Sequence, residues 1–353
     1  MAGGDQGPPR TDARLCPQEV FRMKRLGKTL SSAFAVLVLV LVVGITFTIG
    51  WHPFIGPKVR PLTARTFERT PQRLERGRYI AIARSGCIWC HSPHAWDAPG
   101  APIVPGKEGA GELWPAPGLP GRIVAPNLTP DPETGSGPWS DDQLARSIRE
   151  GVSHDGRALF PIMPYVLFRR MSDEDLASVV VYLRSIPPVR NSLPSTEVTF
   201  PVRYLINVVP QPVISPVPDL APNSDSVTHG AYLVNMAGCG ECHTPQDKGR
   251  QFPGMDFAGG SVFQGLGPFL PTVASANITP DPSGISYYDE ALFLEVMRTG
   301  TVKARQLSPI MPFNVYKSLT NDDLKAIFAS SCANGTGKRP TLGRRIGCSQ
   351  VSS

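Results

Sequence analysis

Two five-residue strings in this chain combine thiols with an imidazole at a spacing that suits covalent attachment of a cofactor. They are Cys87-Ile88-Trp89-Cys90-His91 and Cys239-Gly240-Glu241-Cys242-His243. Residues three and four apart lie on one face of a helix, so both thiols and the ring can reach the same group. Each thiol can form a thioether with a haem vinyl group, and the histidine can bind the iron. The spacing therefore predicts two covalently bound haem c groups on Cys87, Cys90, Cys239 and Cys242, with His91 and His243 as iron ligands.

A zinc ribbon is the main alternative for these strings, because it also uses paired Cys-x-x-Cys sequences. A zinc site does not need a histidine directly after the second cysteine. It would also place both cysteine pairs in one domain.

Each motif is followed by the same two strings in the same order, which indicates an internal repeat. In copy one they are NLTPDP and PIMPY, and in copy two they are NITPDP and PIMPF; their positions are Asn127–Pro132, Pro161–Tyr165, Asn277–Pro282 and Pro309–Phe313. The repeat predicts two tandem domains at 70–190 and 228–330, joined by a Pro-rich linker at 191–227.

A methionine between prolines recurs at the matched position of both copies, as Met163 and Met311. A lone methionine is usually core filler, but a thioether also binds haem iron and favours its ferrous state. The recurrence predicts that Met163 and Met311 are the second axial ligands. His154 competes in copy one, although copy two has no histidine there; a surface or propionate-side role is expected for it. Arg157 follows as a candidate partner of a haem propionate, and exposed loop arginine is the alternative.

Helix signals outnumber strand signals, so the sequence predicts an all-α fold of short helices around the haems. The sequence of copy two departs from that of copy one in its last helix, which we expect to be shortened after Phe328. A divergent basic tail then follows at 331–353. A shortened helix would leave the second haem less covered. The predicted helices are Leu74–Arg84, Ser140 to Gly151 with a capping box to Gln143, a helix opened by Ser172 and Asp175 and stopped by Pro187, His229–Met236, and a helix from Ser286 to Gly300.

The segment from Leu30 to Trp51 contains no charged residue and is long enough to cross a bilayer as a helix. Basic residues precede it, so the positive-inside rule puts residues 1–29 in the cytoplasm and the haem domains on the periplasmic side of the inner membrane. A cleaved signal peptide is the alternative, but the apolar run is long and no Ala-x-Ala follows it. The sequence predicts a single-pass anchor at 30–51.

The net charge of +6 comes from the flanks of this segment and from the C-terminal tail. No basic cluster is interleaved with aromatic residues, so nucleic-acid binding is not expected. Beyond the haem motifs, Cys332 and Cys348 would face an oxidising compartment and could pair.

The string from Asn127 to Tyr165, downstream of Cys-x-x-Cys-His, resembles the class I cytochrome c modules of the cytochrome subunits of membrane-bound periplasmic alcohol, sugar and sugar-acid dehydrogenases. The resemblance covers about residues 70–190 and 228–328. Many such subunits carry three haems, whereas this chain has motifs for two. The resemblance implies electron transfer toward a terminal oxidase through covalent haem with histidine and methionine ligands.

These observations predict a membrane-anchored dihaem electron carrier that is not itself an enzyme. It would take electrons from a periplasmic or membrane-bound dehydrogenase and pass them to a downstream oxidase or cytochrome. The alternative is a dihaem redox enzyme of the peroxidase or thiosulfate-oxidising type, which needs an iron with an open position. Two matched methionines argue against such an open position.

Overall fold

The computed structural model describes residues 17–98, 101–115, 118–221, 224–247, 249–265 and 270–334. The chain falls into two units, Met1–Ile55 and Gly56–Ser353. Both predicted haem domains belong to the second unit. The predicted basic tail beyond residue 334, Cys348 and the first 16 residues lie outside the described residues.

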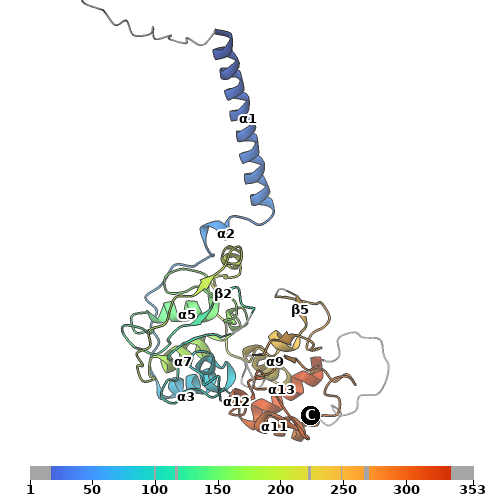
Figure 1. The fold of residues 1–353 in the computed structure, drawn as a ribbon. Helices are drawn as coiled ribbons and strands as arrows, with labels where there is room; N and C mark the ends of the chain where they lie inside the picture. The colour runs from blue at the N-terminus through green and yellow to red at the C-terminus, as the bar shows by residue number, and fades with distance from the viewer. Residues whose placement is uncertain are drawn as a thin grey trace, which may run out of the picture. The chain divides into compact units, whose positions relative to one another are not determined.

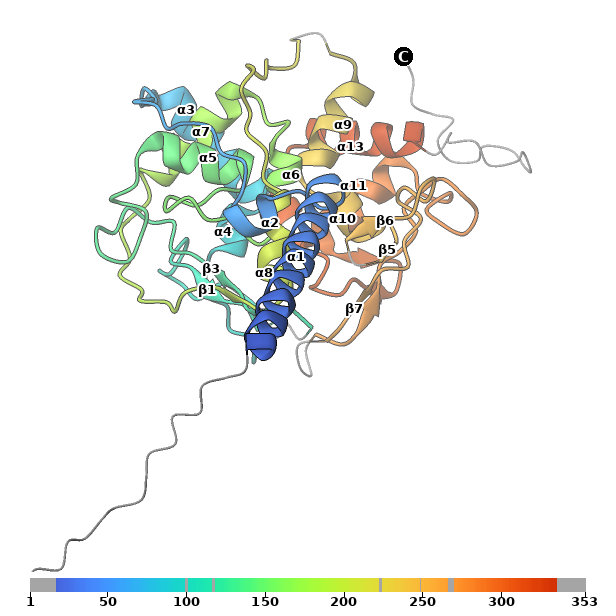
Figure 2. The ribbon, with the colours of Figure 1, turned by 90° about the horizontal axis from the view of Figure 1, so that it is seen from above.

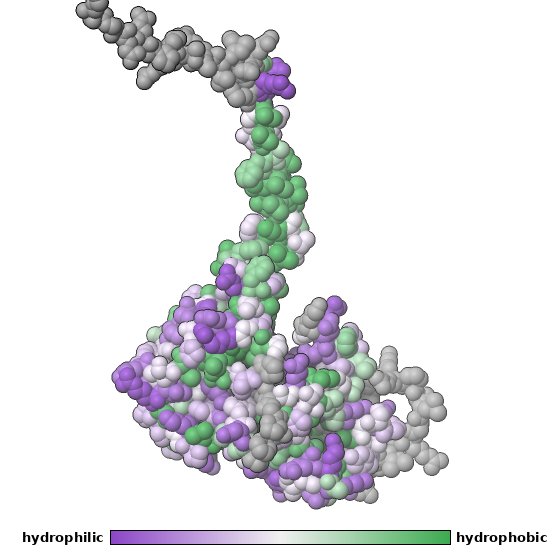
Figure 3. All heavy atoms as spheres, in the orientation of Figure 1, coloured by the Kyte–Doolittle hydropathy of each residue, from purple (hydrophilic) through white to green (hydrophobic). Residues whose placement is uncertain are grey.

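The first unit contains the long helix α1 (Pro17–Phe47) and the short helix α2 (His52–Ile55). Within α1, the 23 residues Arg25–Phe47 form the one stretch in the described part of the chain that is long and apolar enough to cross a membrane. They span about 34 Å at 1.5 Å per residue. Figure 3 shows the apolar surface that runs along this helix. Length and composition fit a membrane anchor or a signal sequence.

Copy one is built on two helices that pack along each other, α3 (Pro71–Tyr79) and α7 (Asp173–Leu183). The predicted helix Leu74–Arg84 is confirmed, although it begins earlier and ends in a π-helical turn, η1 (Ile80–Arg84). The cap of α7 is also confirmed, because the Ser172 hydroxyl accepts a hydrogen bond from the Asp175 amide at 3.1 Å.

Copy one has three further helices, of which α4 (Cys87–Cys90) contains the cysteines of the first motif and α6 (Tyr165–Phe168) directly follows the Pro-Ile-Met-Pro string. These two helices have four residues each. The third, α5 (Asp141–Glu150), carries the predicted capping box between Ser140 and Gln143 and ends at Gly151 in the left-handed region.

Copy two repeats this order with α9 (Ser226–Met236), α10 (Cys239–His243), α11 (Glu290–Thr299), α12 (Phe313–Tyr316) and α13 (Asn321–Asn334). In Figures 1 and 2, the helices α3, α5 and α7 of copy one gather on one side of this unit, and α11 and α13 of copy two on the other. Helix α9 packs along α13 as α3 packs along α7.

Two glycines explain how these helix pairs approach so closely. A Cβ atom on Gly77 of α3 would lie 1.9 Å from the carbonyl oxygen of Ser178 in α7. A Cβ atom on Gly230 of α9 would lie 1.8 Å from the carbonyl oxygen of Ala326 in α13. Only glycine allows the two backbones to pack at this distance, so both copies use the same helix crossing.

Two predicted features of copy two are wrong. Helix α11 begins at Glu290 and is capped by Asp289, whose side chain accepts from the Leu292 amide, rather than by Ser286. The closing helix is not shortened: α13 has 14 residues, against 11 in α7. The serines beyond Phe328 are compatible with a helix, since the Ser331 hydroxyl donates to the Ile327 carbonyl at 2.9 Å. Cys332, in the last turn of α13, is disulfide-bonded.

Strands contribute little to the described part of the chain, as predicted. They are two residues long and form antiparallel pairs: β1 (Glu112–Leu113) with β3 (Val124–Ala125), β2 (Gly121–Arg122) with β4 (Glu197–Val198), β5 (Gln246–Asp247) with β6 (Arg250–Gln251), β7 (Val262–Phe263) with β8 (Val273–Ala274), and β9 (Thr301–Val302) with β10 (Arg305–Gln306).

The predicted linker lies against copy one. Its strand β4 pairs with β2. At the start of α7, the Asp173 amide donates to the Val217 carbonyl at 2.8 Å, and the Val217 amide donates to the Asp173 carboxylate at 3.2 Å. The linker also contains α8 (Val202–Leu205) and the 3₁₀ turn η2 (Ile206–Val208).

Candidate functional site

Both Cys-x-x-Cys-His strings fold as single helical turns, α4 and α10, directly after a longer helix. The four thiols of Cys87, Cys90, Cys239 and Cys242 are free. Since each pair is three residues apart on one turn, the two thiols of a motif face the same side. The helical turn that the sequence predicted for thioether attachment is therefore present in both copies.

Burial favours the protonated form of these four thiols at neutral pH. Loss of hydration raises the pKa of the Cys87, Cys90 and Cys239 thiols to about 12 and that of Cys242 to about 11. Within the described ranges, no group of three or more His, Cys, Asp and Glu side chains could hold a metal ion. The zinc alternative therefore has no donor set in this part of the chain.

The imidazole of each motif is oriented by a backbone carbonyl. His91 Nδ1 lies 2.8 Å from the Pro126 oxygen, and His243 Nδ1 lies 2.7 Å from the Ala276 oxygen. A ring that donates through Nδ1 leaves Nε2 as the nitrogen that can bind a metal. Burial lowers the pKa of both histidines, although the hydrogen bond to the carbonyl acts in the opposite direction. The lowered pKa keeps each ring in the neutral form that can bind a metal.

The repeated Asn-x-Thr-Pro-Asp-Pro string builds the turn that presents this carbonyl. In copy one, Asn127 Oδ1 accepts from the amide of Thr129 at 2.9 Å and from its hydroxyl at 2.7 Å. Asn277 and Thr279 make the same two bonds at the same distances in copy two. Sequence reasoning used this string only as a repeat marker and missed the carbonyls before it, although the Asn-x-Thr pattern is a recognisable side-chain turn.

Each methionine of the Pro-Ile-Met-Pro strings belongs to the apolar cluster of its own motif. Met163 packs against the cluster that contains Cys87, and Met311 packs against the cluster that also includes Cys239. The following prolines have nearly equal backbone angles, with φ −81° and ψ 45° at Pro164 and φ −78° and ψ 51° at Pro312. The two methionine loops therefore have the same local shape, and each brings a thioether into the apolar surroundings of a Cys-x-x-Cys-His turn.

These residues fit a haem in the chemistry of their donors. Free thiols, a neutral imidazole with Nε2 uncommitted and a thioether surrounded by apolar side chains suit a covalently held iron porphyrin. The motifs differ in exposure: Cys87 and His91 are 8% and 7% exposed, whereas Cys239, Cys242 and His243 are only partly buried. The second motif is thus more open, although its closing helix is complete.

Other candidates lie away from these clusters or have different partners. The exposed His154 ring stacks on Trp139 at a centroid distance of 4.3 Å. Arg157 Nε donates to Asp155 at 3.1 Å. His94 has no histidine counterpart in copy two; it is buried, and its Nδ1 lies 2.7 Å from Glu112 Oε2.

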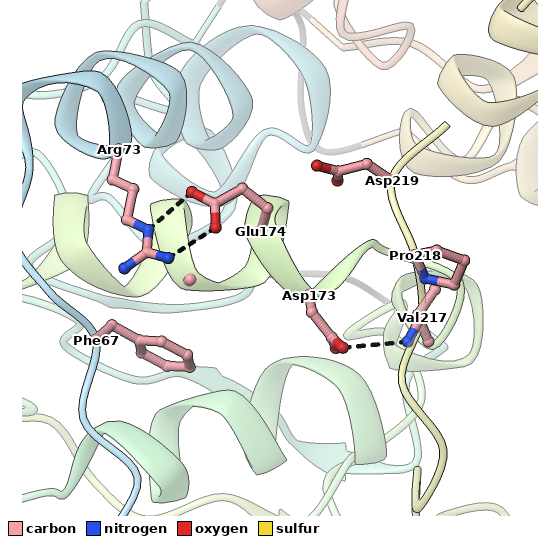
Figure 4. A pocket seen from close by; sticks show the side chains of 8 residues that line it. Phe67, Arg73, Asp173, Glu174, Val217, Pro218 and Asp219 are labelled. Carbon is pink, nitrogen blue, oxygen red and sulfur yellow. Dashed lines mark hydrogen bonds and ion pairs between the residues drawn. The ribbon is translucent and has the colours of Figure 1, made fainter. Parts of the chain in front are cut away.

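A surface hollow of about 340 Å³ lies between α3, α7 and the linker (Figure 4). Its charged groups already have partners, because Arg73 makes two hydrogen bonds with Glu174 at 2.7 and 2.8 Å. Asp173 is held by the Val217 amide in the same view. The hollow is where the linker rests on copy one, and it has none of the haem-motif residues in its lining.

No protein-family model matches the chain. Three similar proteins are cytochromes. The chain is 30% identical to the dihaem c-type cytochrome of Cereibacter sphaeroides over 223 residues, which cover 60% of this chain and 71% of that protein. It is 30% identical to the cytochrome c subunit of the quinone alcohol dehydrogenase of Gluconobacter oxydans over 237 residues, 65% of this chain and 47% of the subunit. It is 32% identical to the gluconate 2-dehydrogenase cytochrome c subunit of Pantoea cypripedii over 180 residues, 49% of this chain and 38% of the subunit.

The chain spans about half or less of the length of the two dehydrogenase subunits. It spans more than two thirds of the dihaem cytochrome, in an alignment that covers most of this chain. Together with the two Cys-x-x-Cys-His turns, this similarity means that the chain belongs to the c-type cytochromes that include this dihaem cytochrome and the cytochrome subunits of alcohol and gluconate dehydrogenases.

Proposed function

We propose that this chain is a membrane-anchored dihaem cytochrome c that carries electrons from a dehydrogenase to a downstream oxidase or cytochrome on the periplasmic side of the inner membrane. The observation that carries the proposal is the duplication of one complete donor set. Each copy has a free thiol pair, an imidazole held through Nδ1 and a methionine in the same apolar cluster.

In copy one, Cys87 and Cys90 would hold the haem covalently, and His91 and Met163 would be its axial ligands; in copy two these roles would fall to Cys239, Cys242, His243 and Met311. Bound haem c supplies an iron that changes between ferric and ferrous states by one electron. The Pro126 carbonyl keeps the His91 ring in one tautomer, and the proline after Met163 stiffens the loop that presents its sulfur. An iron held by both a histidine and a methionine would offer no open position to a substrate.

The partner is proposed from the relatives. The Gluconobacter and Pantoea proteins are cytochrome subunits of an alcohol dehydrogenase and of a gluconate dehydrogenase. A chain with the same cytochrome modules and an apolar helix in front of them suits a similar place beside a dehydrogenase. The anchor proposal is supported by the length and exposure of Arg25–Phe47.

Haem content tests the first part of the proposal. We expect the purified protein to have the mass of the chain plus two haem groups, and its reduced spectrum to show c-type haem alone. Carbon monoxide added to the reduced protein should bind slowly or not at all. Rapid binding at one haem would instead favour the dihaem enzyme, because it reveals an open iron position.

Fractionation tests the anchor. The full chain should sediment with membranes, and a chain that lacks residues 1–51 and carries a separate export signal should be soluble with both haems attached. A mature protein whose N-terminus lies beyond Trp51 would identify the segment as a cleaved signal peptide.

A further inference from the structure

The two copies contact each other through a pair of tyrosines. Tyr79, the last residue of α3 in copy one, reaches the first turn of α13 in copy two. Its hydroxyl donates to Asp323 Oδ2 at 2.8 Å and accepts from the Thr320 amide at 2.8 Å. Thr320 in turn caps that turn, because its hydroxyl accepts from the Asp323 amide at 3.1 Å.

Tyr232 of α9 makes the reciprocal contact from copy two to copy one. Its hydroxyl donates to Asp175 Oδ2 at 2.6 Å and accepts from the Ser172 amide at 3.2 Å, and Ser172 is the cap of α7. Tyr79 and Tyr232 each stand two residues after the glycine of their helix crossing, Gly77 or Gly230. Asp175 and Asp323 are the third residues of α7 and α13. The two copies therefore exchange equivalent side chains across one interface.

The carboxylates at this interface are buried, since Asp175 is 2% and Asp323 is 5% exposed. A single guanidinium connects them: Arg84 Nη2 lies 2.9 Å from Asp323 Oδ2, and Nη1 lies 4.0 Å from Asp175 Oδ2. Each carboxylate also has a partner within its own copy: Arg76 Nε donates to Asp175 Oδ1, and His229 Nε2 lies 2.8 Å from Asp323 Oδ1. The tyrosine adds one hydrogen bond from the other copy, and the loss of a hydrogen bond to a buried charged group is costly. The copies therefore separate only with the loss of such a bond at both sites.

Arg84 has no counterpart in copy two, and the backbone shows why. One more residue lies between Tyr79 and Cys87 than between Tyr232 and Cys239, and copy one accommodates it in the π-helical turn η1. A π turn is the usual result of one extra residue in a helix. The extra residue brings a cation to the interface between the two carboxylates.

The residues directly before both Cys-x-x-Cys-His motifs also contact the other copy. A methyl group on Gly86, just before the first motif, would lie 3.7 Å from Val315 in α12. A methyl group on Gly238, just before the second motif, would lie 3.5 Å from Leu167 in α6. Helices α6 and α12 directly follow the two methionine loops. The glycine before each motif therefore lies against the helix that follows the methionine loop of the other copy.

We propose that Tyr79 and Tyr232 are positioning residues that hold the two haem-binding segments against each other, and we call their paired contacts with Asp323 and Asp175 the tyrosine latch. Because of the latch, the first turns of α7 and α13 unfold locally together and not independently. The latch also fixes the separation of the two haems. The statement about the haems rests on the proposed function, whereas the statement about local unfolding does not.

The test uses the full-length protein and three variants: Tyr79→Phe, Tyr232→Phe and the double variant. Tyr165→Phe is the matched control, because the Tyr165 hydroxyl bonds within copy one to the Leu159 carbonyl at 3.2 Å and copy two has Phe313 at this position. Amide hydrogen exchange is followed in the first turns of α7 and α13. Each single variant should speed exchange about tenfold in both turns, and the double variant should add little more. The control should change neither turn.

Faster exchange only at the helix that the mutated tyrosine contacts, with additive effects in the double variant, would overturn the latch. The second readout is the magnetic interaction between the two ferric haems, measured by electron paramagnetic resonance. A single separation in the wild type should become a broad distribution in the double variant and stay unchanged in Tyr165→Phe. An unchanged distribution in the double variant would also overturn the latch.

Haem content is measured on the same samples. Two haems in copies that open independently would overturn the latch and leave the carrier proposal standing. A haem count other than two would overturn the carrier proposal, and the exchange experiment would still decide whether the tyrosines hold the copies together.

Discussion

Replacing Gly230 by alanine tests the helix crossing that carries the second haem motif. The new Cβ atom would lie 1.8 Å from the Ala326 carbonyl oxygen and 2.8 Å from Ser330 Cβ. A backbone oxygen inside α13 cannot move by itself without breaking that helix, so α9 and α13 must move apart. Restoring an ordinary contact of 3.4 Å requires a shift of roughly 1.6 Å.

This shift separates apolar side chains that are now in close contact. Leu233 and Leu324 are 1% and 0% exposed, and both belong to the cluster that includes Met311. Overpacking of a core costs about 1–3 kcal/mol, and opening a gap beside two leucines adds to it. We therefore expect Gly230→Ala to lower the free energy of unfolding by about 3 kcal/mol or more, and the unfolding midpoint by roughly 5–10 °C.

The measurement is thermal unfolding followed by circular dichroism and by haem absorbance. Gly240→Ala is the control, because Gly240 is also helical and its Cβ would lie at an ordinary 3.6 Å from Phe257. Copy one has Ile88 at the matched position. Alanine there should be neutral or slightly stabilising. Equal midpoints for the two variants would refute the close helix crossing.

The remaining predictions concern the donors and the interface carboxylate. Met163→Ala and Met311→Ala should each lower the midpoint potential of one haem, because the thioether favours ferrous iron; a redox titration in which neither potential falls would contradict their role as ligands. Replacing both Cys239 and Cys242 by alanine should reduce the covalent haem content from two to one, measured by intact mass, and an unchanged mass would exclude this motif as the attachment site. Burial disfavours the charged form of Asp323, but Arg84 and the hydrogen-bonding groups around it outweigh this and lower its pKa below 3.8. The ionised Asp323 should therefore stabilise the folded protein above pH 3.8, and this stabilisation should be lost as the pH falls through the lowered pKa. The difference in unfolding free energy between wild type and Asp323→Asn should shrink in acid, and a difference independent of pH would contradict this.

Local signals in the sequence were enough to predict much of the fold. The cap at Ser140, the glycine ends at Gly151 and Gly300 and the two motif turns depend on residues within one or two turns of each other. The start of α11 was predicted wrongly because Ser286 and Asp289 are both good caps within one turn. The backbone uses the residues before Asp289 for another turn, in which the Tyr288 amide donates to the Ile285 carbonyl at 2.9 Å.

The parts of the site that could not be predicted depend on backbone groups or on contacts between distant segments. The Pro126 carbonyl that orients His91 has no side-chain signature, and only the turn that follows it is visible in the sequence. The exchange of Tyr79 and Tyr232 joins residues far apart in the chain, so neither periodicity nor spacing indicates it. A comparison of the two copies does indicate that both tyrosines occupy matched positions.

The different exposure of the two motifs has its cause in the loops that follow them. In copy one, Trp89 lies between the motif cysteines and packs edge-on against His94 and Trp114, at centroid distances of 5.1 and 5.8 Å. Glu112 binds this group together, since it accepts from the His94 amide and from the Trp96 ring nitrogen, both at 2.8 Å.

Copy two has no aromatic residue at the matched positions of this loop. The exposed Glu241 replaces Trp89, Gln246 replaces His94, Gly260 replaces Glu112, and Val262, which is 68% exposed, replaces Trp114. A glutamate and a glycine cannot form an aromatic cover over the motif, and aromatic rings bury far more area than these side chains. Because α13 is longer than α7, a shortened closing helix does not account for the more open second motif. The aromatic group beside the first motif has no equivalent at the matched positions of copy two, and this is the difference in sequence that accompanies the difference in exposure.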